Sequence, residues 1–419
     1  MRLRGKDGQT LWLGYGMNVH PGGDARSTIE AIQTTVVPLK ARLGVAGPFG
    51  LAVRWSDAGV RELLAQQALF DELVGLLQDY DLRIFTGNAF VHGDFHGRGI
   101  KDDVYRPDWS EEARGAYTVR FAEVLGRLGK AGVACEGPIS LSTSPLSWKG
   151  WEDGAARAER GIVEAVLVAA GLWGVERAYG QRVELAFEPE PGCSVETTAE
   201  LLAAFDTLRA QAKQARADGA LGSVETEDYL AACYDVCHQA VEWEDAEANL
   251  RAIRDAGISI AKLQASCALE LTDPHDEAAR AALAAFDEPV YLHQVGARDA
   301  EGTLHVADDL SDVLDDPAWR DRGPWRSHFH VPVFRDALVG GLRTTRPELE
   351  RALRITARES ITNHIEIETY TWDVLPEAEK EAGSGFDLVD ALEREMRWVL
   401  GVLAEEGVTP MDAAGGDDA

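Results

Sequence analysis

The segment V-E-L-A-F-E-P-E-P, residues 183–191, has the pattern of a strand that ends in acidic residues. Side chains alternate across a strand, so Glu184, Ala186 and Glu188 share one face, and Glu188 lies at the C-terminal end. In a barrel of parallel strands, alternate residues point inward, and those at the C-terminal ends reach the open mouth where catalytic groups gather. The segment therefore predicts one strand of such a barrel, with Glu188 at its mouth.

The rest of the chain supports a barrel, because a strand followed by a helix occurs eight times. Short apolar runs rich in Val, Ile, Phe and Leu alternate with longer stretches of helical period, which is typical of a parallel sheet covered by helices. The predicted strands cover residues 11–19, 49–55, 82–88, 133–141, 183–188, 231–235, 258–264 and 364–369. Eight such units predict an α/β fold of the (β/α)8 TIM-barrel type.

The seventh unit is irregular, because residues 265–344 separate its strand from its helix. This segment is too long for a plain loop, and it contains two further strand-like runs, residues 289–298 and 328–334. We expect an insertion after strand seven, at the end of the barrel that carries the chemistry. The polar and acidic run 299–325 is expected to form a lid or loop within it.

Length and composition fit one folded domain. The chain has 419 residues, of which 45% are hydrophobic and 27% are charged, close to ordinary globular usage. No Pro/Ser-rich linker divides it, so we expect a single TIM-barrel domain over residues 1–408. Residues 409–419 have no periodic apolar pattern and are expected to form a disordered acidic tail.

Charge and hydropathy narrow the choice of partners. There are 41 Lys and Arg against 71 Asp and Glu, a net charge of −30 that would repel nucleic-acid backbones and anionic lipid surfaces, so we expect no nucleic-acid partner. The most apolar helix-length segment, residues 165–175, is far shorter than the roughly 20 residues of a bilayer span, so no membrane span is expected. The lack of a signal-peptide pattern and five scattered cysteines, which suggest reduced thiols, favour a cytoplasmic location.

Two more predicted strands end in groups that bind metals. In H-I-E-I-E-T-Y-T-W, residues 364–372, Glu368 lies at the strand end. In A-A-C-Y-D-V-C-H, residues 231–238, Asp235 ends the strand and His238 follows within a turn. Carboxylates and one imidazole that meet at a barrel mouth suit Mn2+, Mg2+, Co2+ or Zn2+ better than a thiolate metal. The predicted site comprises Glu188, Asp235, His238 and Glu368.

A barrel interior without a metal is the alternative. Strand seven points Lys262 and Gln264 inward, and Lys262 and Arg54 could pair with the acidic residues. Isolated buried carboxylates cost several kcal/mol unless an ion compensates them, and their place at the strand ends favours a metal. Lys262 could also form a Schiff base, but we favour an ion pair with Glu184 or Glu366 inside the barrel.

Further polar and aromatic residues near the predicted mouth are candidates for binding a substrate. His328 and His330 share one face of a strand-like run in the insertion, and Tyr370 and Trp372 follow Glu368 closely enough to form an aromatic wall. Each also has a plain structural explanation, as a satisfied histidine, a turn residue or an aromatic packed in the core. The predicted substrate residues are Asn18, His20, Asn88, Lys262, His328 and Trp372.

These segments together resemble the xylose isomerase-like barrels, the group that holds sugar isomerases, ketose 3-epimerases and endonuclease IV. The strongest short motif is C-Y-D-V-C-H, residues 233–238. More narrowly, the chain resembles the EboE family, the barrel proteins of the bacterial ebo metabolite-traffic cluster. That resemblance spans nearly the whole chain. It is carried by N-V-H-P-G at 18–22, F-E-P-E-P at 187–191, H-F-H-V-P-V-F at 328–334 and I-E-I-E-T-Y-T-W-D-V-L-P at 365–376.

The resemblance implies a divalent metal at the mouth, with Glu188, Asp235 and Glu368 as ligands and His238 beside them. The chain departs from the group at the exit of strand seven, where a histidine ligand is common and this sequence has Gln264. Either Gln264 serves as a ligand, or His330 reaches in from the insertion, or the metal is bound poorly and the protein is a non-catalytic relative. The EboE resemblance also implies a role in moving or maturing a small metabolite, with other ebo-cluster proteins as partners.

We therefore expect an isomerase- or epimerase-like enzyme that uses a divalent metal and acts on a small metabolite. Glu188 and Glu368 would supply the base and the acid on opposite faces of the substrate, with the metal stabilising an enediolate. A carrier that binds a metabolite at the mouth without turnover is the alternative. Phosphodiester cleavage, as in endonuclease IV, is disfavoured because DNA binding needs a basic groove.

Overall fold

Parallel strands make the centre of the fold, which a computed structural model describes for residues 1–93, 101–289, 291–376 and 386–411. Their order within one ten-stranded sheet is β2, β14, β8, β7, β6, β5, β4 and β3, and every neighbouring pair in this series is parallel. The strands are β2 (Thr10–Tyr15), β3 (Phe49–Arg54), β4 (Leu82–Asn88), β5 (Ile139–Thr143), β6 (Val183–Phe187), β7 (Leu230–Asp235), β8 (Ile260–Ala265) and β14 (His364–Ile367). Each strand predicted from the sequence overlaps one of them.

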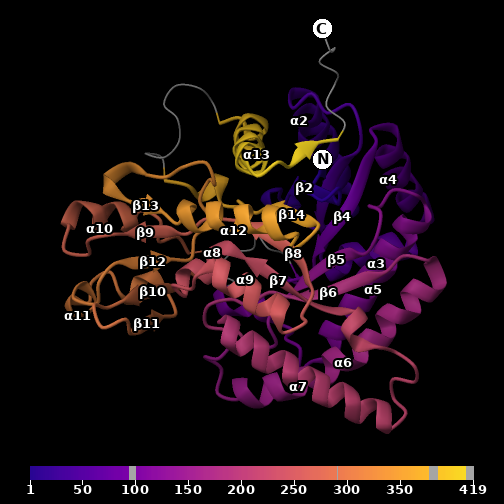
Figure 1. Cartoon of the computed structure of the whole chain (residues 1–419), viewed down its shortest axis with the longest axis horizontal. Helices are drawn as coiled ribbons and strands as arrows, with labels where there is room; N and C mark the ends of the chain where they lie inside the picture. The colour runs from indigo at the N-terminus through magenta and orange to yellow at the C-terminus, as the bar shows by residue number, and fades with distance from the viewer. Residues whose placement is uncertain (94–100, 290, 377–385, 412–419) are drawn as a thin grey trace.

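Helices alternate with these strands and cover the sheet (Figure 1). Several begin at a side chain that accepts a hydrogen bond from the first turn, such as Ser56 before α3 and Thr197 before α7, where Glu200 completes a capping box. The helices are α1 (Ala25–Ala31), α2 (Val37–Arg42), α3 (Asp57–Ala65), α4 (Gln67–Asp79), α5 (Glu112–Lys130), α6 (Gly154–Tyr179), α7 (Thr198–Ala217), α8 (Val236–Val241), α9 (Ala246–Asp255), α12 (Arg346–Glu359) and α13 (Leu388–Glu405).

The first and last strands of the series approach each other. Gly16, which follows β2, forms a parallel bridge with Ala52 of β3. Glycines allow this approach, because a Cβ atom added at Gly14 would lie 2.8 Å from the carbonyl oxygen of Gly50. The two strands at the ends of the parallel series, β2 and β3, are therefore linked through their backbones.

Two short strands extend the sheet beyond β2. β1 (Arg2–Arg4) pairs antiparallel with β2 and also with β15 (Thr409–Pro410), so the first and last described segments lie side by side. The sequence placed Thr409 and Pro410 in a disordered tail, but they pair with β1 because an edge strand leaves backbone groups that a second strand can satisfy. Residues 412–419 of that predicted tail lie outside the described residues.

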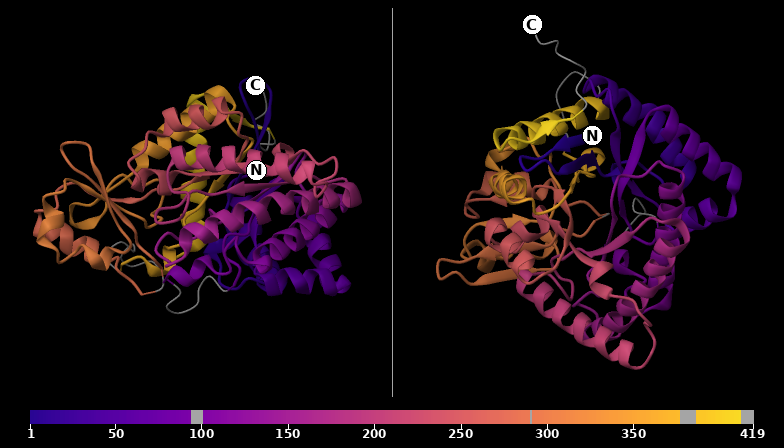
Figure 2. Two further views of the ribbon diagram at one scale, coloured as in Figure 1. Left: turned by 90° about the horizontal axis from the view of Figure 1, so that it is seen from below. Right: turned by 45° about the vertical axis from the view of Figure 1, so that its right-hand side comes forward.

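A second sheet lies beside the first and occupies the segment between β8 and α12 (Figures 1 and 2). Its five strands are antiparallel where they pair, in the order β11, β10, β12, β9, β13. The predicted run 328–334 is not a strand but an irregular segment after β12 that ends in a turn, and the expected lid over 299–325 contains β11 and α11. The elements are β9 (Leu269–Leu271), α10 (Glu277–Ala284), β10 (Val295–Arg298), β11 (Leu304–Ala307), α11 (Pro317–Arg320), β12 (Trp325–Ser327) and β13 (Arg343–Thr344).

The second sheet is fastened to α8 and to the turn after it. The Arg326 guanidinium lies 3.9 Å from the centre of the Trp243 ring and donates a hydrogen bond to the carbonyl of Ala240. Gly296 of β10 brings its backbone against Val241, since a Cβ atom there would lie 2.0 Å from the Val241 carbonyl oxygen. These contacts fix where the segment after β12 meets the main sheet.

Inside the parallel sheet, polar side chains pair with one another. Lys262 of β8 forms an ion pair with Glu366 of β14, and both are fully buried. His364 Nδ1 lies 2.9 Å from Ser140 Oγ, which in turn donates to Thr86 Oγ1 at 2.7 Å. The ion pair that the sequence favoured for Lys262 is therefore present. Within the described ranges, no helix combines the length and apolar character that a membrane crossing requires.

Candidate metal centre

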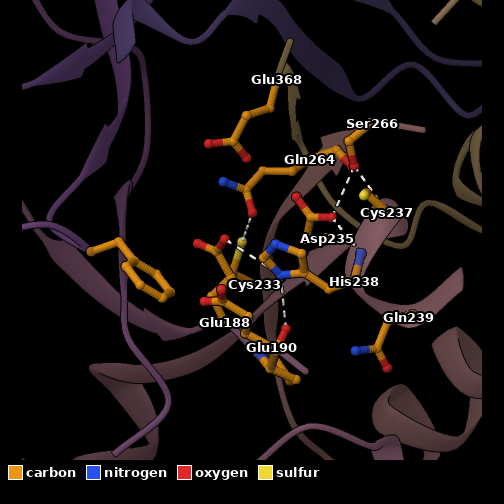
Figure 3. A network of polar contacts seen from close by, with 12 residues as sticks. Glu188, Glu190, Cys233, Asp235, Cys237, His238, Gln239, Gln264, Ser266 and Glu368 are labelled. Carbon is orange, nitrogen blue, oxygen red and sulfur yellow. Dashed lines mark hydrogen bonds and ion pairs between the residues drawn. The ribbon is translucent and has the colours of Figure 1, made fainter. Parts of the chain in front are cut away.

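Three carboxylates from separate strands meet at the C-terminal ends of the parallel strands (Figure 3). Glu188 follows β6, Asp235 ends β7 and Glu368 follows β14. One oxygen from each lies within 4.8 Å of one from each of the others, and all three residues are buried. We call these residues the acidic group. Alternation along each strand correctly predicted that they converge.

Asp235 is held from two sides. As the N-cap of α8, it accepts a hydrogen bond through Oδ1 from the backbone N–H of His238 at 2.9 Å. The Ser266 hydroxyl donates to the same oxygen at 2.9 Å. The carboxylate is thereby oriented by the helix that it starts, and its Oδ2 is left for another partner.

Glu368 is held by two amides. Asn18 and Asn88 donate to its Oε1 through Nδ2, at 2.8 Å and 3.3 Å. Both asparagines lie near strand ends, Asn18 in the turn after β2 and Asn88 at the end of β4. Their place at the mouth, predicted from the sequence, therefore serves to orient a member of the acidic group.

The oxygens that remain form the chemical core of the site. Glu188 Oε2, Asp235 Oδ2 and Glu368 Oε2 are buried and accept no hydrogen bond from any described residue. A buried carboxylate oxygen without a donor is costly, and three of them from converging residues fit a hard divalent cation that takes oxygen ligands. The residues present therefore fit the metal that the sequence implied.

The electrostatics agree with such a cation site. Burial and the charge of Asp235 raise the pKa of Glu188, while burial and the charge of Glu188 raise the pKa of Glu368. The pKa of Asp235 is lowered despite its burial, because His238, His330 and its two hydrogen bonds favour the ionised form. A bound cation would stabilise all three ionised carboxylates.

Three imidazoles border the acidic group, and we call His238, His328 and His330 the histidine group. Their ring centres lie 4.6 Å apart for His238 and His328, 5.5 Å for His238 and His330, and 5.2 Å for His328 and His330. Burial lowers the pKa of all three, to about 4 for His238. Asp235 has a ligand atom within 4.8 Å of both His238 and His330. The sequence placed His238 and His330 with one metal and His328 with the substrate, whereas the structure brings the three together.

Gln264 and Lys262 differ in what they can offer. Gln264 lies between Glu368 and Glu188 (Figure 3), but its Oε1 accepts a hydrogen bond from Cys233 Sγ at 2.9 Å. The amide oxygen expected to bind a metal is therefore engaged. Glu366 beside Lys262 holds the pKa of that ammonium above its ordinary value even though burial opposes the charge, which disfavours a nucleophilic amine.

An open cavity leads to the acidic group. Many of its lining residues are apolar or aromatic. The polar lining residues are Glu188, Glu368, the histidine group, Asn18, Asn88, Arg54, Lys101 and Glu190. Of the residues predicted for the substrate, Asn18, Asn88 and His328 line this cavity. The aromatic and apolar wall residues are Phe90, Val91, Val104, Tyr105, Tyr291, Leu292 and Tyr370.

Three residues predicted for the substrate, His20, Lys262 and Trp372, do not line the cavity, and Lys262 is the one already paired with Glu366. The His20 ring meets Tyr15, whose hydroxyl is 2.9 Å from Nε2. Trp372 stacks with Phe334 and Phe386, at ring-centre distances of 6.5 Å and 5.5 Å. The aromatic wall expected after Glu368 is supplied by Tyr370 instead.

Several lining residues were not predicted from the sequence. Glu190 carried a signal, because it is the second glutamate of F-E-P-E-P and lies on the same side as Glu188 by alternation. It accepts a hydrogen bond from the Tyr105 hydroxyl at 2.8 Å. Phe90 and Tyr291 lie outside the helices and strands, Tyr105 ends the short 3-10 helix Lys101–Tyr105, and no local pattern marks the three.

Comparisons with known proteins give similarity of fold only. No protein-family model matches the sequence, and no curated protein is significantly similar to it. The IolI protein with a bound zinc atom is 11% identical, with 94% of this chain and 99% of that chain covered and a TM-score of 0.46. A xylose isomerase-like TIM barrel protein from Mycobacterium smegmatis, in complex with magnesium, is 12% identical, with 96% and 94% covered and a TM-score of 0.46. A 3-keto-D-glucoside 4-epimerase from E. coli is 10% identical, with 93% and 98% covered and a TM-score of 0.43.

Proposed function

We propose that the parallel strands close into a (β/α)8 barrel, with residues 265–344 as an insertion after its seventh strand. The parallel bridge between Gly16 and Ala52 supports closure, as does the near contact of Gly14 with Gly50. In a closed barrel the C-terminal strand ends share one mouth, where active sites of this fold lie. The proposal assigns the acidic group to that mouth.

We infer that the protein is a divalent-metal-dependent isomerase or epimerase of a small metabolite. The observation that carries this inference is the convergence of the three buried carboxylates, each of which keeps one oxygen without a donor among the described residues. These residues would hold the cation, which when bound would polarise a carbonyl or hydroxyl oxygen of the substrate.

The protein's own carboxylates would move the protons. Glu188 and Glu368 come from β6 and β14, which are separated in the sheet by β7 and β8, so they approach the cavity from different sides. One would take a proton from a substrate carbon while the other returns a proton to the opposite face, which inverts or shifts that centre. Asn18 and Asn88 would keep Glu368 in place, because both donate to its Oε1.

Solvent deuterium tests this function directly. Metal-free protein is loaded with Mn2+, Mg2+, Co2+ or Zn2+ and incubated in D2O with a panel of ketoses and keto-sugars, and NMR follows deuterium at the exchanging carbon. Exchange is expected only with metal, and Glu188→Gln or Glu368→Gln should abolish it while the circular dichroism spectrum is unchanged. Metal-independent exchange, or exchange that survives both substitutions, would contradict the proposal.

A carrier in a metabolite-traffic system, as in the EboE family, is the second candidate. The apolar and aromatic cavity wall favours it, because such a wall suits a hydrophobic or ring-bearing metabolite better than a bare sugar. Other ebo-cluster proteins would then be its partners. Titration of metal-free protein with a hydrophobic metabolite, read by tryptophan fluorescence, separates the two functions, since a carrier binds tightly without metal and without any change in the ligand.

A further inference from the structure

The histidine group is built from two parts of the chain that are distant in sequence. His238 lies in the first turn of α8, directly after Asp235 has capped that helix. His328 and His330 follow β12 of the second sheet, and the backbone N–H of His328 donates to the Gln294 carbonyl at 2.8 Å. Nothing in the proposed proton transfer needs three imidazoles at this point.

Hydrogen bonds determine which ring nitrogens carry protons. His238 Nδ1 lies 3.0 Å from the carbonyl oxygen of Pro189, and His330 Nδ1 lies 2.7 Å from the carbonyl oxygen of Glu368. A carbonyl oxygen only accepts, so each Nδ1 is the donor. In a neutral imidazole the Nε2 atom then has a lone pair and no proton.

His328 follows the same rule through a side chain. Its Nδ1 lies 2.7 Å from Gln294 Oε1. The orientation of the Gln294 amide is fixed, because its Nε2 donates to the Pro191 carbonyl at 2.9 Å. Gln294 therefore presents its oxygen to His328, which donates from Nδ1 and keeps its Nε2 bare.

Two of the bare nitrogens, those of His328 and His330, face each other. His328 Nε2 and His330 Nε2 are 3.2 Å apart, and the His238 ring closes the third side of the group. In neutral rings with these tautomers, no proton lies between the two Nε2 atoms, so their lone pairs oppose each other. All three residues are at least nine-tenths buried, at 4%, 6% and 1% exposed for His238, His328 and His330, and burial disfavours a protonated ring.

A metal ion removes this conflict, because it accepts lone pairs from several imidazoles at once. We propose that the Nε2 atoms of His328 and His330 bind a second divalent cation, of the borderline class that prefers imidazole, such as Zn2+. Cys237 offers a third ligand atom, because its sulfur lies within 4.8 Å of a nitrogen of each of these two rings. The Nδ1 hydrogen bonds of both histidines are the outer contacts that orient metal-binding histidines. The acidic group remains a separate oxygen site, and Asp235 borders both sites.

Zinc counting provides the first test. Full-length, metal-free protein is incubated with ZnCl2 alone, desalted and analysed for zinc. The wild-type chain is expected to retain two zinc ions, and His328→Gln or His330→Gln is expected to retain one. His305→Gln is the matched control, because His305 also lies in the second sheet but bonds to Asp299 outside the cavity. The control should retain two.

X-ray absorption at the zinc edge gives a second measurement that needs no variant. Wild-type protein with both sites filled should show imidazole scattering, and this scattering should be lost in the His330→Gln protein. Wild-type zinc with only oxygen neighbours would overturn the proposal. So would a single zinc that is unaffected by both histidine substitutions, which is the result expected if His328 and His330 share a proton instead.

The two sites can fail separately. Glu188→Gln combined with Glu368→Gln should remove the oxygen-bound zinc and leave the imidazole-bound one. If the histidine substitutions release zinc but the two glutamate substitutions do not, the second cation site is supported and the metal site of the proposed function is contradicted. If only the carboxylate pair releases zinc, the reverse holds.

Discussion

Asp235 Oδ1 accepts the backbone N–H of His238 at 2.9 Å, so a single carboxylate both starts α8 and belongs to the acidic group. The local fold and the site thus share one side chain. Its Oδ1 is used for the helix cap, and its Oδ2 is buried without a donor among the described residues. A substitution at Asp235 that keeps the helix cap but removes the charge should therefore affect the metal site alone.

Asp235→Asn should keep the cap and lose the metal. Asparagine caps helices about as well as aspartate, so the free energy of unfolding of metal-free protein should change by less than about 1 kcal/mol. Mn2+ affinity, measured by isothermal titration calorimetry, should fall at least ~100-fold because a charged ligand is lost. Asp245→Asn is the control, since Asp245 caps α9 in the same way through the Ala248 N–H at 2.8 Å and does not line the cavity. Equal metal affinity in both variants would refute the assignment.

The asparagines that donate to Glu368 should raise the metal affinity of the site without binding the metal themselves. Asn88→Leu and Asn18→Leu remove donors to Glu368 Oε1, and loss of such an outer contact typically lowers metal affinity by about 10- to 100-fold. His20→Gln should leave Mn2+ affinity unchanged, because His20 meets Tyr15 outside the cavity. Titration calorimetry on the three variants distinguishes this from a general loss of structure. If His20→Gln weakens binding as much as the asparagine variants, the orienting role is wrong.

Removing one partner of the buried pair Lys262 and Glu366 should destabilise the protein more than removing both. Lys262→Met leaves Glu366 buried without its cation, and breaking a buried pair typically costs about 3–5 kcal/mol of unfolding free energy. Replacing both, as Lys262→Met with Glu366→Leu, should recover most of that loss. Urea unfolding followed by circular dichroism measures both effects. A Lys262→Met protein as stable as wild type would show that the pair does not hold the interior together.

Glu242 should make the stability of the protein depend on pH. Burial, followed by the charges of Glu196 and Glu244, raises its pKa from an ordinary value of 4.5 to about 8, and neither carboxylate oxygen has a partner among the described residues. The folded protein therefore holds a proton that the unfolded chain releases, so the contribution of this group to stability is fully present below pH 4.5 and is lost as the pH rises to about 8.

Glu242→Gln should reduce the loss of unfolding free energy between pH 4.5 and about 8. We expect it to raise the unfolding free energy at pH 8.5 by roughly 1–3 kcal/mol relative to wild type, and by much less near pH 5. Urea unfolding at a series of pH values, in the presence of a chelator, gives the comparison. Glu30→Gln on the exposed face of α1 is the control and should leave the profile unchanged. If the unfolding free energies of wild type and Glu242→Gln change with pH in parallel, the folded protein does not hold a proton on Glu242.

Local pattern predicts the parallel strands and the acidic group for the same physical reason. Alternation along a strand determines which face a side chain takes, and the end of an apolar run determines how far along the sheet it lies. The convergence of Glu188, Asp235 and Glu368 therefore follows from the amino-acid pattern alone. The misplaced start of the fourth predicted strand has a local cause, since Gly137 with a φ of 89° interrupts the run 133–141 before β5 begins at Ile139.

What the sequence did not predict depends on contacts between distant segments. The second sheet forms from strands of two to four residues, too short for alternation to be recognised. The engagement of Gln264 by Cys233 and the turn of Trp372 toward Phe334 are each decided by a neighbour from another element. The grouping of His328 with His238 likewise needs the second sheet in place against α8.

The placement of the second sheet against α8 depends on Gly296, which has no Cβ atom. A methyl group at this residue would clash with the Val241 carbonyl and force β10 away from the end of α8. Because β12, which pairs with β10, leads directly into His328, the added methyl group would displace His328 and His330 relative to Asp235 and His238, although residue 296 does not line the cavity. The position of the His328 and His330 rings next to α8 thus depends on a residue of β10 that has no side chain.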